Sequence, residues 1–206
     1  MNKLFGFYEL KDLPVPSVDW KEFKSGTILD DSKLWTIRTA VLSGDDTSLP
    51  RMVGKSAKEC MEYAESLLKN YRGKLFIVYY PFFGAVKSGT MMVEKDTTVI
   101  EAVYKDLWNL VDLHKLDYSA KVLKSGNVRV NNGELNFFTE SELNTLIKCA
   151  DKVRTYFNKV IRANELVLLE WSFGRDVDVN GEEVGEPYLI FYEARTVNGN
   201  PLNNMF

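Results

Sequence analysis

The sequence contains few of the residues on which cysteine and histidine chemistry depends. Among its 206 residues there are only two cysteines, Cys60 and Cys149, and one histidine, His114. The cysteines lie far apart with no CxxC spacing, which excludes a disulfide-rich secreted scaffold and argues against a zinc site. A single histidine argues equally against a mechanism that needs a histidine pair or a histidine-rich metal cluster.

Long apolar runs and an excess of positive charge are also missing. No run approaches the roughly 18 apolar residues typical of a membrane-spanning helix, and the first ten residues lack the apolar core of a secretory signal. The formal net charge is -3, whereas nucleic-acid-binding domains are usually basic. We therefore expect a cytoplasmic protein with no membrane segment and no nucleic-acid partner.

The sequence pattern predicts an α+β protein of one domain or two small lobes. Proline punctuation, with LPVP at 13–16, favours extended chain over the first 33 residues. Ser56 and Glu59 have capping-box spacing and predict a helix that ends near Gly73. Thr139 and Glu142 predict a second, longer helix with an apolar stripe reaching Ile161.

The remaining segments predict antiparallel hairpins instead of a repeating βαβ unit. The expected loops are 43–54 and the polar hairpin connection 174–186. A short helix is expected over 105–112. The expected strands are 34–40, 74–83, 89–94, 97–104, 118–123, 127–130, 134–138, 165–172 and 187–194.

Arg38 is the only charged residue within the predicted strand 34–40. It is compatible with an outward-facing residue on a half-exposed strand, since charges are rarely buried without a partner. It is also compatible with an anion clamp, because the Gly/Ser/Thr-rich loop that follows has backbone N–H groups that can cradle phosphate.

Glu170, Glu193 and Arg195 lie on the last two predicted strands. Alternation places Glu193 and Arg195 on one face, and the hairpin can bring Glu170 onto that face. Two carboxylates beside an arginine suit a magnesium–nucleotide site, since Mg²⁺ takes one or two carboxylates plus phosphate oxygens and a guanidinium grips phosphate. The alternative is a cross-strand salt bridge, which contributes little when it is exposed.

Taken in order, these segments resemble the nucleotide-binding domain of the phosphoenolpyruvate synthase and pyruvate phosphate dikinase family, an ATP-grasp fold. The matching segments are LPVP at 13–16, WTIRTA at 35–40, DDTSLPRMVG at 45–54, IVYYPFFGAVKSGT at 77–90, VIEAV at 99–103, LLEWS at 168–172 and YLIFYEARTV at 188–197. The collinear order over nearly the whole chain carries the resemblance more than any single motif does.

The resemblance implies an ATP-grasp-like domain over 1–206, with one lobe over 1–73 and a hinge and second lobe over 74–206. It implies that Arg38 and Arg195 are catalytic, contacting phosphate, and that Glu170 and Glu193 hold metal. It also places Tyr80 near a nucleotide-contacting glutamine of the family. The implied cofactors are ATP and Mg²⁺.

The chain also departs from the family. The family's GGKG segment, which supplies a lysine, is not recognisable, and Lys3 lies too close to LPVP by about two residues. The family's GLGE is replaced by YKDLWN at 104–109, and its phosphohistidine domain is missing. We expect an ATP- and magnesium-binding phosphotransferase component that acts on a separate acceptor protein or small molecule. The alternatives are a catalytically degenerate nucleotide-sensing or interaction module with the same fold, and a purely structural domain.

Overall fold

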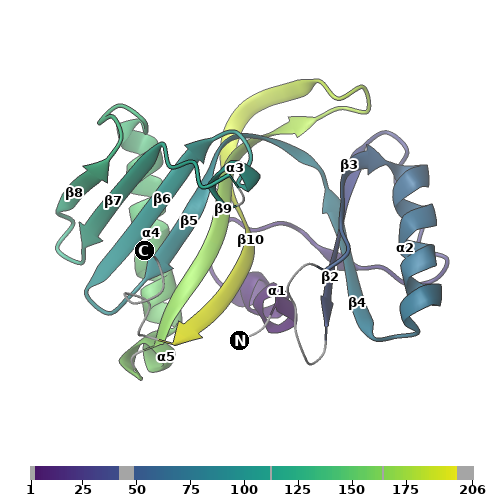
Figure 1. Ribbon diagram of the computed structural model, residues 1–206, viewed down its shortest axis with the longest axis horizontal. Coiled ribbons are helices and arrows are strands. Elements are labelled where there is room, and N and C mark those ends of the chain that lie inside the picture. Colours follow the sequence, from purple (N-terminus) through teal and green to yellow (C-terminus); the bar gives the residue numbers. More distant parts are fainter. Residues whose placement is uncertain (1–2, 42–48, 112, 164, 199–206) are drawn as a thin grey trace.

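The chain folds into two antiparallel sheets that lie side by side with helices packed against them (Figure 1). The computed structural model describes residues 3–41, 49–111, 113–163 and 165–198. The expected α+β class with two sheet-based halves is confirmed. Within the described residues, none of the helices has the length and apolar character needed to cross a membrane.

The smaller sheet has the strand order β1-β4-β2-β3. Its strands are β1 (Lys21–Glu22), β2 (Leu34–Val41), β3 (Met52–Ser56) and β4 (Leu75–Pro81). Helix α2 (Ala57–Tyr71) covers one face, and Ser56 and Glu59 form the predicted capping box at its start. Ala57, Cys60 and Ala64 on this helix pack against Ile37 and Ile77 of the sheet, so Cys60 is a core residue.

The larger sheet has the strand order β10-β9-β5-β6-β7-β8. Its strands are β5 (Phe83–Val93), β6 (Thr97–Tyr104), β7 (Tyr118–Leu123), β8 (Val128–Asn132), β9 (Glu165–Val177) and β10 (Glu183–Asn198). Helix α3 (Trp108–Val111) follows β6. Helices α4 (Glu140–Tyr156) and α5 (Asn158–Arg162) follow the meander. In Figure 1, α4 lies behind the sheet and α5 lies at the lower end of β9.

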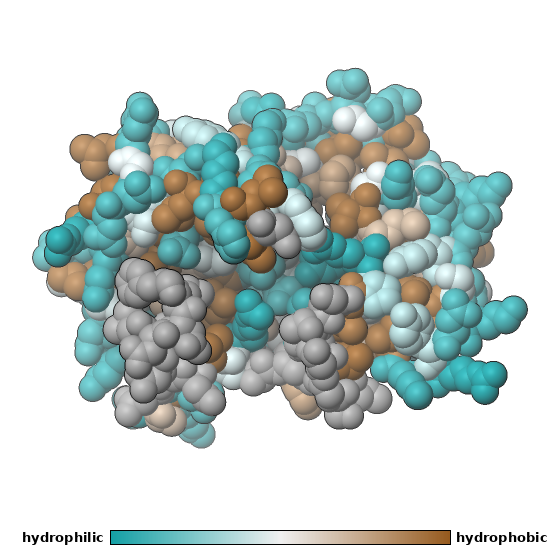
Figure 2. Space-filling model, in the orientation of Figure 1, coloured by the Kyte–Doolittle hydropathy of each residue, from teal (hydrophilic) through white to brown (hydrophobic). Residues whose placement is uncertain are grey.

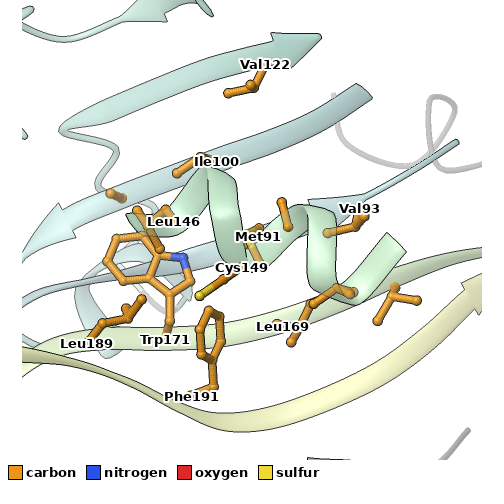
Figure 3. Close-up of a cluster of buried hydrophobic side chains, with 14 of the residues drawn as sticks. Met91, Val93, Ile100, Val122, Leu146, Cys149, Leu169, Trp171, Leu189 and Phe191 are labelled. Atoms are coloured by element: carbon orange, nitrogen blue, oxygen red, sulfur yellow. The ribbon is translucent and has the colours of Figure 1, made fainter. Parts of the chain in front are cut away.

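One face of the larger sheet forms the main core with α4. Trp171 is fully buried there beside Leu146 and Cys149 of the helix and Phe191 of β10 (Figure 3). The predicted capping box at Thr139 and Glu142 is present. The opposite face carries the half-buried polar side chains of Thr90, Glu101 and Glu170, which stand opposite one another on β5, β6 and β9.

Several sequence-based predictions of local structure are wrong. Residues 134–138 form no strand, because a turn hydrogen bond runs from the Phe137 N–H to the Glu134 carbonyl and the two phenylalanines pack on Tyr118 instead. The hairpin connection 174–186 is mostly strand, since β9 and β10 pair out to Val177 and Glu183. Part of the expected loop 43–54 is β3; residues 42–48 lie outside the described residues.

The predicted strand 74–83 is divided between the two sheets. β4 pairs with β1 and β2, whereas β5 pairs with β6 and β9. The chain therefore changes sheet at Phe82, while the expected lobe division at residue 73 separates β4 from the strands with which it pairs.

The expected extended N-terminal segment begins as a helix. Residues Lys3–Asp12 form α1, which ends just before the LPVP segment. Its buried residues, Leu4, Phe7 and Leu10, lie on one side and pack between β10 and the small sheet. Ten residues are too few for hydrophobic periodicity to distinguish a helix from extended chain. The burial of one side of α1 against the rest of the protein stabilises the helix.

Gly6 allows α1 to approach β10 closely. A Cβ at this position would collide with the carbonyl oxygen of Ala194, which belongs to backbone and cannot rotate away. We expect Gly6→Ala to lower the free energy of unfolding by about 2 kcal/mol, as overpacking typically does, despite alanine's higher helix propensity. Urea denaturation measures this loss; a variant as stable as the wild type would contradict the close packing.

Candidate functional site

Three charged side chains from different elements meet where α1, β2 and β10 come together. Arg38 of β2 donates a hydrogen bond from Nη2 to Oε2 of Glu193 on β10 at 2.9 Å. The Nζ of Lys3 on α1 lies 3.8 Å from the same oxygen. Glu193 is only 6% exposed and the Arg38 side chain 16%. The pair therefore joins the two sheets through a largely buried ionic contact.

A β-bulge determines which face of the sheet Glu193 occupies. Leu189 and Phe191 of β10 stand opposite Phe173 and Trp171 on the core side. The register then shifts between Phe191 and Glu193, so that Glu193 pairs with Glu170. Simple alternation would have kept Glu193 on the core side with Phe191. The bulge instead turns Glu193 toward the polar face, as bulges commonly do near functional sites.

The two glutamates now lie opposite each other on neighbouring strands. Directly opposed residues of an antiparallel pair have Cβ atoms about 5 Å apart. Burial raises the pKa of Glu170 to about 7, and the nearby Glu193 adds to this rise, while Arg38, Arg195 and Lys3 oppose it. A carboxyl group of this kind takes up a proton near neutrality or ionises when a cation is close.

Arg38 is surrounded by groups that favour its charge. Burial opposes the charge, but Tyr80, Glu193 and Glu170 outweigh it and raise the pKa of Arg38 above its ordinary value. Tyr80 of β4 is buried and hydrogen-bonds to Arg38. Tyr80, which the resemblance places near a nucleotide-contacting residue, therefore holds the guanidinium in position from within the small sheet.

A chain of three buried hydroxyl groups lies next to the glutamates, on β10, β9 and the neighbouring strand β5. Tyr192, the extra residue of the bulge, hydrogen-bonds to Ser172 of β9, and the Ser172 and Ser88 hydroxyls lie 2.8 Å apart. Burial raises the pKa of Tyr192 well above its ordinary value, and the negative charge of Glu170 adds to the rise. These contacts fix the bulge against β9 and β5.

The structure brings together the residues singled out in the sequence. Arg195 lies farther toward the surface than the others. Arg38, Tyr80, Glu170 and Glu193 form one cluster. Arg195 is exposed and stands opposite Leu168, although its charge reaches Glu170 and lowers that pKa.

Lys3 belongs to this cluster, but its spacing from LPVP argued against its use. The sequence pattern predicts extended chain over these residues, whereas residues 3–12 form α1, and Lys3 at its start lies beside Glu193 of β10. His114 lies outside the cluster, in an exposed segment after α3.

A polar cavity of about 390 Å³ adjoins the cluster. Its lining residues are Lys3, Arg38, Thr39, Leu49, Pro50, Arg51 and Trp108. Hydrophilic side chains gather between the two halves of the molecule on the face shown in Figure 2. Of the described lining residues, three are cationic and none is acidic, which suits the cavity to an anion although the chain as a whole is acidic.

The fit of a divalent cation rests on the glutamate pair. No group of three or more His, Cys, Asp or Glu side chains that could hold a metal occurs among the described residues. Glu170 and Glu193 nevertheless supply two facing carboxyl groups, and Mg²⁺ commonly takes one or two carboxylates with the remaining ligands from phosphate and water. The residues present therefore fit a magnesium ion that is bound together with a phosphate ligand. They fit less well a metal ion whose ligands all come from the protein.

Comparison with known proteins identifies the fold. No protein-family model and no curated protein matches the sequence. Among solved structures, the D-alanine–D-alanine ligase of Helicobacter pylori matches with a TM-score of 0.52 and 13% identity over 100% of this chain and 56% of that chain. The L-amino acid ligase of Bacillus licheniformis matches with a TM-score of 0.49 and 12% identity. That match covers 94% of this chain and 39% of the ligase chain.

The chain thus spans about half the length of the solved structures it matches. At these identities the likeness concerns the fold alone. The Helicobacter pylori protein is an ATP-grasp ligase, so the likeness to it supports the ATP-grasp expectation without singling out the phosphoenolpyruvate synthase family. The chain has an ATP-grasp-like fold.

Proposed function

We propose that this domain binds ATP with Mg²⁺ between its two sheets and acts as the nucleotide-binding component of a phosphotransferase. The observation that carries the proposal is the convergence of Lys3, Arg38, Glu170 and Glu193 from four different elements beside a cavity lined by cations. The ATP-grasp-like fold and the resemblance to the phosphoenolpyruvate synthase domain support the same ligand.

The charges divide naturally between the two parts of a magnesium nucleotide. Glu170 and Glu193 would hold the metal, which when bound neutralises phosphate charge and orients the phosphates. Arg38 and Lys3 face the cavity, where their positive charges stabilise phosphate oxygens. Arg195, at the exposed margin, contributes longer-range attraction. Phosphoryl transfer needs mainly such positioning and electrostatics, and the acceptor is a separate protein or small molecule.

A second candidate function is nucleotide sensing without turnover. It is favoured by one specific observation: Glu193 already pairs with both Arg38 and Lys3. Entry of a metal and a phosphate has to redistribute these pairs, and a site whose cations are satisfied within the protein is compatible with binding that changes conformation instead of driving catalysis.

Isothermal titration with Mg-ATP tests binding. We expect the wild-type protein to bind and Arg38→Gln to bind about 30-fold more weakly or worse, because a charged hydrogen bond to phosphate contributes about 2 kcal/mol. Arg129→Gln, which removes a charge from the exposed strand β8, is the matched control and should bind like the wild type. Circular dichroism checks that Arg38→Gln is folded.

The two candidate functions differ in their products. Incubation with Mg-ATP and measurement of ADP and AMP separates phosphoryl transfer or hydrolysis from binding alone. No heat of binding at millimolar Mg-ATP with folded wild-type protein would overturn both candidates.

A further inference from the structure

Two residues that line the cavity, Arg51 and Trp108, are neither predicted site residues nor part of the proposed metal site. Arg51 lies just before β3 of the small sheet, and Trp108 is the first residue of α3 in the larger half. The guanidinium carbon of Arg51 lies 4.7 Å from the centre of the Trp108 ring. This stacked pair therefore bridges the two halves of the molecule beside the cavity.

Separate hydrogen bonds fix the two ends of this bridge. The Thr39 hydroxyl, which is buried, donates to the Pro50 carbonyl at 2.7 Å and ties the segment before Arg51 to β2 next to Arg38. The backbone N–H of Trp108 donates to Oδ1 of Asp106 at 2.7 Å, which fixes the start of α3. The backbone on each side is anchored, while both side chains remain exposed to solvent.

The charge of the cavity indicates what it holds. Among the described residues that line it, the ionisable ones are Lys3, Arg38 and Arg51. Lys3 and Arg38 have Glu193 as a partner, whereas Arg51 faces the aromatic ring, which holds a cation weakly at an exposed site. A ligand with several negative charges gains from all three cations, and a neutral or singly charged ligand does not.

We propose that Arg51 and Trp108 form the outer wall of a polyphosphate-binding site, in which Arg51 leaves the Trp108 ring to bind phosphate while Lys3 and Arg38 bind from the opposite side. The inference deepens the proposed function, on which its choice of a phosphate-chain ligand rests. It adds a residue pair that selects by the number of phosphates, and it predicts a change at Trp108 when the ligand enters.

Trp108 provides a direct optical readout of this event. Of the four tryptophans, Trp108 is 49% exposed, whereas Trp20, Trp35 and Trp171 are at most 8% exposed. Neutral acrylamide quenching therefore reports mainly on Trp108. We expect the quenching constant to change on addition of inorganic tripolyphosphate, and the change to be absent in Trp108→Phe.

The affinity test compares tripolyphosphate, Mg-ATP and Mg-ADP by calorimetry. We expect Arg51→Gln to weaken tripolyphosphate and ATP by about tenfold, the effect of one lost charged contact, and ADP by less. Arg129→Gln removes the same charge far from the cavity lining and should leave all three unchanged. Denaturation of Arg51→Gln checks that any loss of binding is not a loss of folded protein.

The outcomes separate this inference from the proposed function. If the wild type binds Mg-ATP but Arg51→Gln binds like Arg129→Gln, the role of Arg51 is overturned and the proposed function stands. If tripolyphosphate binds in an Arg51-dependent way and Mg-ATP does not, the polyphosphate site stands and ATP is the wrong ligand. If neither binds to folded wild-type protein, both are overturned.

Discussion

Gly89→Ala should lower the free energy of unfolding by about 3 kcal/mol, at the upper end of the cost of overpacking a well-packed core. Gly89 lies in β5, a central strand of the larger sheet, opposite Trp171 of β9. A Cβ at residue 89 would lie 2.5 Å from Cζ2 of the Trp171 indole and would also collide with the Glu101 carbonyl oxygen. Neither neighbour has room to move, because Trp171 is fully buried and Glu101 is held in β6.

The matched control for this substitution is Gly126→Ala. Gly126 has a positive φ of 90° and open space where a Cβ would be built, so its substitution incurs only the left-handed backbone cost of about 1 kcal/mol. Urea denaturation of both variants measures the difference. Equal losses of stability in the two variants would mean that the Trp171 indole does not require residue 89 to lack a side chain.

Glu170→Gln should stabilise the protein at pH 8 and change little at pH 4. The folded-state pKa of Glu170 is raised to about 7, above the value of roughly 4.3 in an unfolded chain. The folded state therefore holds this proton more tightly. The associated stability is fully present below about pH 4 and is lost as the pH rises through 7.

The neutral amide of glutamine avoids this loss. The stability gap between Glu170→Gln and the wild type should therefore grow from near zero at pH 4 to at most about 4 kcal/mol at pH 8, from about 1.4 kcal/mol for each unit of pKa. Urea denaturation at several pH values measures it, with Glu134→Gln in an exposed turn as control. Parallel curves for Glu170→Gln and the wild type would show that Glu170 does not hold a raised pKa.

Local sequence signals predicted the elements that depend on few residues. Both capping boxes, Ser56 with Glu59 and Thr139 with Glu142, are present at the predicted helix starts. The signal failed where an element is short or where pairing decides its length: α1 was expected to be extended, and β9 and β10 run well beyond their predicted ends. Strand pairing supplies hydrogen bonds that no local pattern reveals.

The candidate site divides in the same way. Arg38, Glu170 and Glu193 could be singled out because charges inside apolar strands need a partner, but the sequence did not show that Arg38 pairs with Glu193, 155 residues away. Arg51 and Trp108 were not predicted as site residues, although they lie in the DDTSLPRMVG and YKDLWN segments, and the spacing of Lys3 argued against its use. They enter the site only because α1, the segment before β3 and the turn after β6 meet around the same cavity.

The sequence by itself determined the α+β class, the main helices and strands, and the residues with unusual charge in apolar surroundings, because these depend on periodicity, capping and composition. Only the tertiary structure decided the site. The bulge at Tyr192 changes the alternation of β10, so Glu193 faces Glu170 instead of the core. The close approach allowed by Gly6 places α1 against β10, with Lys3 beside Glu193. Both depend on backbone contacts between distant segments, and such contacts leave no periodic signature in the chain.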